Sequence, residues 1–174
     1  MGQLNLSQIN SLPDVLKDSK WNIKFSKMPA ISGFSSADID LRSVTMDVPK
    51  ATVGVIDVTI RENTIRIPGR KTYSQTLTLN LIETVDARTM EFLRQWREVC
   101  SAYDTNKVGE RSAREAEILL FHCDDRWKDV WQYKIERAWL TDFTPPSLQD
   151  GSSPAAVKIP LVIAYTSFID SKMA

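Results

Sequence analysis

The stretch YSQTLTLNLIETVDARTMEFLRQW, residues 73–96, changes its hydrophobic period halfway along. Leu77, Leu79 and Leu81 recur at every second residue with polar residues between them, which is the period of a strand that buries one face. From Asp86 onward the apolar residues are spaced three or four apart, which is the period of a helix. The sequence therefore predicts a strand that runs directly into a helix.

The predicted helix spans about residues 85–103 and has one apolar side. Thr84 or Asp86 can cap its first free backbone amides. Its apolar side is formed by Met90, Leu93, Trp96 or Arg97, Cys100 and Tyr103. A helix of this kind is stable when its apolar side packs on a sheet, so we expect it to cover part of a β structure.

Several further segments alternate apolar and polar residues and are predicted strands. Before the quoted stretch they are WNIKFSK (21–27), IDLRSVTMDVP (39–49), TVGVIDVTIR (52–61) and NTIRIPG (63–69). The last of these closes with a predicted Pro-Gly turn. The segment ISGFSSADID (31–40) is a predicted loop because it is rich in serine and glycine.

After the helix the pattern returns to strands. The predicted strands are EILLFHCDD (117–125), WKDVWQYKIERAWLTDF (127–143) and VKIPLVIAYTSF (157–168). In the second of these, Trp131, Tyr133, Ile135 and Trp139 share one parity, and Arg137 interrupts it. The tryptophans sit on the apolar parity of their elements, which favours core packing over base stacking. The segments TNKVGERSARE (105–115) and TPPSLQDGSSP (144–154) are predicted loops.

The predicted elements give a mainly β protein. Six or seven strands with one helix indicate a two-sheet antiparallel β-sandwich or barrel with one flanking helix, and not alternating βαβ units. We expect an N-terminal arm over residues 1–20 and one β domain over residues 21–174. A chain of 174 residues is long enough to bury a core without disulfide bonds.

Charge and composition exclude several classes of function. Lysine plus arginine and aspartate plus glutamate both total 22, so the formal net charge is zero and a general nucleic-acid binder is disfavoured. Cys100 and Cys123 indicate a reduced folding environment. The apolar run IPLVIAY, residues 159–165, is too short to span a bilayer, so no membrane span is predicted.

No catalytic, cofactor or metal site is predicted. His122 is the single histidine, and its neighbour Cys123 should point to the opposite face of a strand, so the two cannot act together as base and nucleophile. A partly buried strand histidine is the favoured interpretation. A zinc site would lack the usual paired ligand spacing. GRKT, residues 69–72, lacks the glycine that begins a phosphate loop.

The order of these segments resembles the tail-tube proteins of contractile-tailed bacteriophages, a family related to the secreted tube proteins of contractile injection systems. The resemblance spans residues 21–168. It depends on SVTMDVP (43–49), on IRIPGRKTYSQTLTLNLIE (65–83) running into VDARTMEFLRQW, and on the final strands YKIERAWLTDF and AVKIPLVIAYTSF. Asp86, Ala87 and Arg88 match the family's helix start, and Trp139 matches an aromatic residue of its late strand.

The resemblance implies a structural virion protein and no enzyme. Copies of the chain would form hexameric rings, which stack into the inner tube of a phage tail and conduct DNA into the host. The implied partners are other copies of the chain, the sheath, baseplate and tail terminator proteins, a tape measure protein in the lumen, and DNA in transit without specific binding. Assembly would take place in the bacterial cytoplasm.

The implied contact residues lie in two places. By the resemblance, residues 50–63 form a hairpin that reaches the adjacent ring. The candidate contact residues between subunits or rings are Asp57, Thr59, Arg61, Asn63, Arg66 and Arg70, together with Thr76, Thr78 and Asn80. The last three are polar and uncharged, and they suit either a lumen wall or a subunit contact.

Four other functions remain open from the sequence. The chain could be a baseplate protein that initiates the tube, or the tube protein of a bacterial contractile injection system. From a different class, an oligonucleotide-binding β-barrel would bind single strands with a steep salt dependence. An enzyme built on His122 is the least favoured, and replacing His122 would then abolish turnover.

Overall fold

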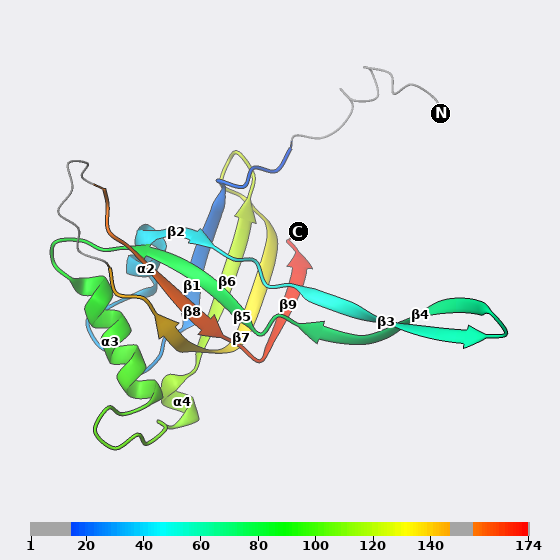
Figure 1. Ribbon diagram of the computed structural model, residues 1–174. Helices are drawn as coiled ribbons and strands as arrows, with labels where there is room; N and C mark the ends of the chain where they lie inside the picture. The colour runs from blue at the N-terminus through cyan, green and yellow to red at the C-terminus, as the bar shows by residue number, and fades with distance from the viewer. Residues whose placement is uncertain (1–14, 147–154, 174) are drawn as a thin grey trace.

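The structure is a computed structural model that describes residues 15–146 and 155–173. Two antiparallel sheets fold over a common core, helix α3 closes one open side, and a long two-stranded hairpin leaves the body (Figure 1). This arrangement confirms the predicted β-sandwich with a flanking helix. Within these ranges, no helix has the length and apolar character needed to cross a bilayer.

Nine strands and three helices make up the described chain. The strands are β1 Trp21–Lys27, β2 Ser43–Met46, β3 Ala51–Ile60, β4 Asn63–Tyr73, β5 Thr76–Ile82, β6 Ala116–Cys123, β7 Asp129–Phe143, β8 Lys158–Ala164 and β9 Ser167–Lys172. The helices are α2 Ser36–Arg42, α3 Arg88–Cys100 and α4 Arg111–Arg114. The predicted helix at about 85–103 is α3, and it is shorter at both ends.

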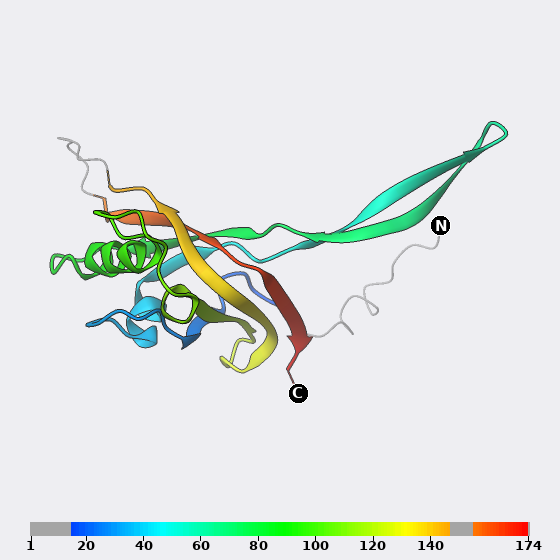
Figure 2. The same cartoon turned by 90° about the horizontal axis from the view of Figure 1, so that it is seen from below.

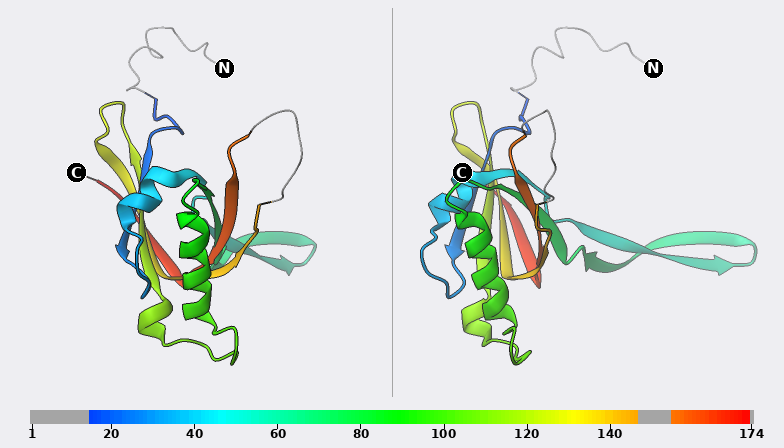
Figure 3. Two further views of the ribbon diagram at one scale, coloured as in Figure 1. Left: turned by 90° about the vertical axis from the view of Figure 1, so that its left-hand side faces the viewer. Right: turned by 60° about the vertical axis from the view of Figure 1, so that its left-hand side comes forward.

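The two sheets share strand β7. One sheet has the order β1-β6-β7-β9 and the other the order β7-β8-β5-β2. Residues 131–136 of β7 pair with β9, and residues 139–143 pair with β8. Between them Arg137 has a positive φ of 54°, and the register to β6 shifts there, which marks a bulge that bends the strand. Figure 3 shows the two layers with α3 against their open side.

The bulge corrects the predicted parity of β7. Ile135 lies in the core with no exposed surface, as predicted, but beyond Arg137 the buried residues are Ala138 and Leu140. Trp139 is half-buried and points away from them. The inserted residue reverses the alternation, and for this reason Trp139 does not share a face with Ile135.

The core lies between the sheets and under α3. Leu77, Leu79 and Leu81 of β5 are at most 2% exposed, which confirms the predicted strand with one buried face. They belong to one cluster with the inward residues of β1, β6, β7 and β8 and with Phe92, Leu93 and Trp96 of α3. Trp96 also donates its indole N–H to the Arg114 carbonyl at 3.0 Å, so α3 is fixed to α4 as well.

The buried side of α3 differs in part from the predicted one. Leu93 and Trp96 are buried as predicted, but Thr89 and Phe92 complete the buried side. Met90 is 37% exposed and Tyr103 is 84% exposed and lies beyond the helix end. The helix begins at Arg88, directly after Ala87, which has a left-handed conformation with a φ of 53°.

The capping of α3 differs from the prediction. Ala87 occupies the N-cap position and makes no side-chain cap bond, and the side chains of Thr84 and Asp86 bond to each other and to Arg42. The carboxylate of Glu83 accepts hydrogen bonds from the amides of Thr89 and Met90 at 3.2 and 2.7 Å. A carboxylate at this end also suits the positive pole of the helix dipole.

Two segments predicted as loops contain helices. Within residues 31–40, Ser35 and Asp38 form a capping box that starts α2, so the predicted strand 39–49 shrinks to β2. Ile39 of α2 is fully buried. In the segment 105–115, α4 adds one turn before β6.

The structure also shows the outcome for the predicted C-terminal strand, for the two cysteines and for part of the predicted arm. The predicted strand 157–168 is divided into β8 and β9 by a bend at Tyr165 and Thr166. Both cysteines are free thiols. The predicted arm is described only from Val15, and residues 1–14 and 147–154, which include most of the predicted loop 144–154, lie outside the described residues.

We predict that Glu83→Ala destabilises the protein by about 1 to 2 kcal/mol, because two amides at the start of α3 lose their acceptor. Urea unfolding followed by circular dichroism measures the change. Asp104→Ala is the matched control: the Asp104 side chain is exposed, and no side-chain hydrogen bond forms there in the described structure, so the effect should stay within about 0.5 kcal/mol. Equal effects of the two variants would contradict this role of Glu83.

Candidate self-assembly surface

The hairpin of β3 and β4 is the part of the structure with the least internal support. It is a separate two-stranded sheet, and nearly every residue of both strands is exposed. In Figures 1 and 2 it extends far beyond the body. Ten residues at about 3.3 Å each give it a length of roughly 30 Å. An isolated two-stranded hairpin is marginally stable in water, so this one needs a partner surface.

The sequence predicted this hairpin in outline. The resemblance implied a hairpin over residues 50–63, whereas the structure has one that includes all of β4 to Tyr73. The predicted Pro-Gly turn is wrong: Pro68 and Gly69 lie inside β4, where the register to β3 shifts. The real turn is Arg61 and Glu62, with φ of 46° and 68°, which is the left-handed geometry of a two-residue hairpin turn.

One face of the hairpin is apolar. The pairs Ile56 with Ile67 and Val58 with Ile65 share this face, and Ile60 extends it toward the tip. These five residues, the hairpin stripe, are between 38% and 56% exposed. Contiguous exposed apolar side chains of this kind mark an interaction surface.

The opposite face is mainly polar and holds several predicted contact residues. Asp57 and Arg66 form an ion pair across the strands at 3.2 Å, and Thr59 and Thr64 lie 3.3 Å apart. Both ion-pair side chains are more than half exposed, so the pair adds little to stability. Arg61 and Asn63 lie at the tip, and Arg70 is near the base of the hairpin.

The other predicted contact residues lie on β5. Thr76, Thr78 and Asn80 share the face opposite to the leucines, on the outside of the β5 sheet. The Asn80 side-chain amide donates to Thr45 Oγ1 of β2 at 2.7 Å. The structure thus places the predicted contact residues on two separate surfaces, the hairpin and the outer face of this sheet.

The outer strands of the two sheets differ in whether another element covers their free edge. The free edge of β1 is covered by α2, since the amides of Ile23 and Phe25 donate to Asp40 Oδ1 at 2.9 Å and to Ser36 Oγ at 2.7 Å. β2 and β9, each at the end of a sheet, pair with one strand only among the described residues. Open edges of this kind are templates for pairing with another chain.

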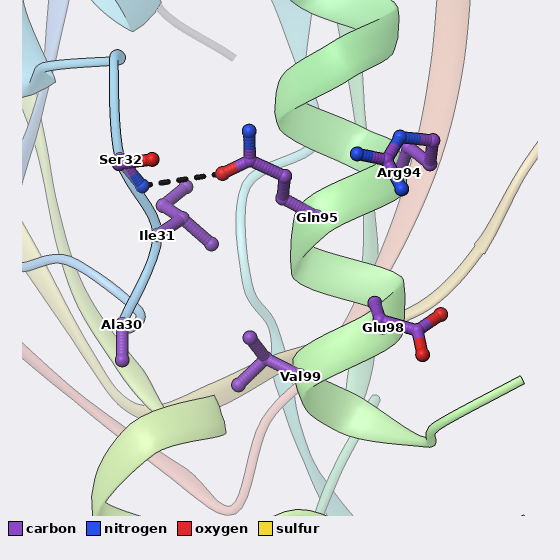
Figure 4. A pocket seen from close by; sticks show the side chains of 7 residues that line it. All are labelled: Ala30, Ile31, Ser32, Arg94, Gln95, Glu98 and Val99. Carbon is purple, nitrogen blue, oxygen red and sulfur yellow. Dashed lines mark hydrogen bonds between the residues drawn. The ribbon is translucent and has the colours of Figure 1, made fainter.

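The surface of the described residues has several grooves. One groove of about 470 Å³ lies beside α3, where Ala30 and Ile31 face Val99 and the Ser32 amide donates to Gln95 at 3.2 Å (Figure 4). Its outer rim is formed by Arg94 and Glu98. The described residues contain no group of three or more histidine, cysteine or acidic side chains that could hold a metal ion.

His122 and Cys123 do not form a reactive pair. His122 is partly buried on its strand, as predicted, and its ring contacts Tyr133 edge-on with the centroids 6.1 Å apart. Burial raises the pKa of the Cys123 thiol to about 11, and a hydrogen bond to the Asp129 carboxylate adds to the effect. A thiol with such a pKa is a poor nucleophile at neutral pH.

We predict that Cys123 in a Cys100→Ser variant reacts with a thiol reagent at pH 8 about 100-fold more slowly than an ordinary thiol, because the thiolate fraction falls tenfold per unit of pKa. Absorbance of the released thiol chromophore gives the rate. Unfolding in guanidinium should restore the ordinary rate. A fast reaction of the folded protein would contradict the raised pKa.

Comparisons with solved structures bear on this fold. The tube-terminating cap of the anti-feeding prophage superposes with a TM-score of 0.66 at 11% identity, over 94% of this chain and 95% of that one. A chain from the sheath/tube terminator of an extracellular contractile injection system, PVC, gives 0.66 at 13% identity, over 92% and 99%. A chain from the PVC sheath-tube complex gives 0.60 at 14%, over 98% and 100%.

These comparisons confirm the resemblance at the level of the fold. The chain has the fold found in tube and terminator components of contractile injection systems, and the match spans nearly the whole length of each chain. Comparisons with protein-family models and with curated proteins found no match.

Proposed function

We propose that this chain is a structural subunit that assembles with copies of itself into hexameric rings, which stack into the inner tube of a contractile tail or injection device. The observation that carries the proposal is the β3–β4 hairpin, which projects from the body with the unburied stripe of Ile56, Val58, Ile60, Ile65 and Ile67. The fold shared with tube and terminator components supports the same role.

Burial of the stripe favours association. Full burial of an aliphatic side chain contributes about 1.5 to 3 kcal/mol, and the stripe residues are roughly half exposed. Covering them against a neighbour therefore contributes on the order of 1 kcal/mol each. The open edges of β2 and β9 offer further backbone pairing between subunits.

In this proposal the predicted contact residues have two roles. Asp57, Thr59, Arg61, Asn63, Arg66 and Arg70 contact the neighbouring subunit or ring through the hairpin. Thr76, Thr78 and Asn80 form an uncharged outward row on strand β5. An uncharged face suits a lumen that passes DNA or another cargo without holding it, because phosphate binding depends on positive charge.

The remaining parts of the proposal concern partners and setting. In a phage, the subunit works in the virion tail, with the sheath outside, baseplate and terminator proteins at the ends, a tape measure protein in the lumen, and DNA in transit. Assembly takes place in the bacterial cytoplasm. The role is structural, with no enzymatic step and no cofactor.

A tube-end protein is a second candidate function. Its support is that the cap and the terminator superpose with TM-scores of 0.66, against 0.60 for a chain of the sheath-tube complex and 0.58 for a chain of the anti-feeding prophage baseplate. A tube subunit polymerises into long tubes, whereas a terminator or initiator stops at one ring. Electron microscopy of the purified protein separates the two, since it shows either rings alone or tubes many rings long.

We predict that Val58→Asp abolishes ring and tube formation, because it introduces a charge into the centre of the stripe. Val85→Asp is the matched control: the same substitution is made at a fully exposed valine outside the hairpin, and assembly should persist. Sedimentation velocity and negative-stain images measure assembly, and circular dichroism checks that both variants fold. Wild-type protein that stays monomeric at every concentration would count against the proposed function.

A further inference from the structure

The hairpin stripe requires a receiving surface, and the body has one that suits it. We propose that the hairpin of one copy inserts its stripe into a groove between β1 and β2 of a second copy. Neighbouring subunits then join through two different surfaces of the same chain. This inference rests on the proposed self-assembly and adds to it the identity of the receiving surface.

The groove, here called the β1–β2 groove, has a volume of about 410 Å³ and lies where the two sheets separate. Trp21 of β1 and Leu120 of β6 form one wall, and Val44, Met46 and Val48 form the other. Its polar lining residues are Asp18, Ser19, Thr45 and His122. Aliphatic side chains of a hairpin would therefore meet a mostly apolar lining with an acidic residue at its rim.

Charge distinguishes this groove from the others. The hairpin, residues 51–73, has four basic residues (Arg61, Arg66, Arg70, Lys71) and two acidic ones (Asp57, Glu62), so its net charge is +2. The whole chain has 22 of each kind, so the remaining residues have a net charge of −2. A basic hairpin is attracted to an acidic rim and repelled by a basic one.

Among five grooves compared on the described surface, the β1–β2 groove is the one whose lining has no lysine or arginine. The groove beside α3 is lined by Arg94. The two grooves at the start of α3 have Arg94 and Arg97 in one case and Arg88 in the other. The fourth, beside the β6–β7 turn, is lined by Lys17, Arg126 and Lys172.

Backbone pairing supports the same site. The edge of β1 beside the groove is covered by α2, but β2 pairs with β5 on one side and with no other described strand. Addition of an extended strand to such an edge is a common mode of recognition, in which the backbone gives affinity and side-chain pockets give specificity. β3 and β4 are both extended and unpaired on their outer edges.

A second copy is needed because the hairpin cannot reach its own groove. Val48 of the groove lies three residues before the start of β3, so the groove is at the root of the hairpin. The stripe runs outward from there, and Ile60 lies about 40 Å of extended chain from Val48. Figures 1 and 2 show the hairpin directed away from the body.

Because the proposed contact joins two different surfaces of the chain, it determines the kind of assembly that forms. A hairpin bound in a groove leaves the partner's hairpin and the first copy's groove free, so each new subunit offers another site. Such head-to-tail contacts build a ring when the rotation closes and an open helix when it does not. They do not end at a dimer.

The test is complementation between two variants that each lose one surface. Val58→Asp removes the stripe and leaves the groove intact. Val48→Lys places a positive charge in the groove, at a residue that is 41% exposed, and leaves the hairpin intact. Ala30→Lys, an exposed residue in the groove beside α3, is the matched control and should assemble like the wild type.

We expect each variant alone to be monomeric and an equimolar mixture to give a 1:1 dimer with no larger species, measured by sedimentation velocity. The dimer should weaken at least tenfold between 50 mM and 500 mM salt, because opposite charges meet at the groove rim. Circular dichroism spectra should match the wild type for both variants.

Each other outcome has a distinct meaning. If Val48→Lys still assembles while Val58→Asp does not, the proposed function stands and the groove assignment is overturned. If mixing two monomeric variants gives no dimer, the pairing of these two surfaces is overturned. If Val58→Asp itself forms rings, both the groove assignment and the role of the hairpin in assembly fail.

Discussion

Strand β5 depends on partners in three directions, and the rest of the body is arranged to supply them. Its three leucines require an apolar cover on one face, which the opposite sheet and α3 provide. Its two edges require backbone partners, which are β2 and β8. Its end leads to Glu83, whose carboxylate holds the first amides of α3. The burial of one strand face thus fixes the position of the helix as well as the order of the sheet.

Much of the fold of the body could be predicted from the sequence, because the alternation of apolar and polar residues indicates which face of a strand is buried. The periods of β1, β5, β6 and β8 gave the correct strands. Three segments were misread where one or two residues override the local pattern. Arg137 inserts a bulge and reverses the parity of β7, and the Ser35–Asp38 capping box converts part of a polar segment into α2. Ala87 in a left-handed conformation shifts the buried side of α3.

The contact surfaces were harder to predict for a different physical reason. The sequence pattern of β3 is that of a half-buried strand, and it names the apolar face correctly, but a pattern cannot say whether the cover comes from the same chain or from another. Only the structure shows that the cover is missing from the described residues. The β1–β2 groove could not be predicted at all, since its walls come from residues about 25 to 100 positions apart.

The hairpin also has a local conformational cost. Its turn uses Arg61 and Glu62 in left-handed conformations, where residues other than glycine are disfavoured by about 1 to 2 kcal/mol each. A ribbon with a strained turn and no core of its own is held in shape mainly by its pairing across the strands. Under the proposed assembly, contact with a partner adds the support that the ribbon lacks.

The shared strand β7 has a mechanical consequence. In most sandwiches two layers meet only through side chains, and a sideways load must be resisted by packing. Here fifteen consecutive residues run from one layer into the other, so a push along that strand is transmitted through covalent bonds. One continuous backbone therefore joins the two layers into a single unit. A tube wall built from such subunits would deform first at the contacts between subunits, while each subunit keeps its own shape under force.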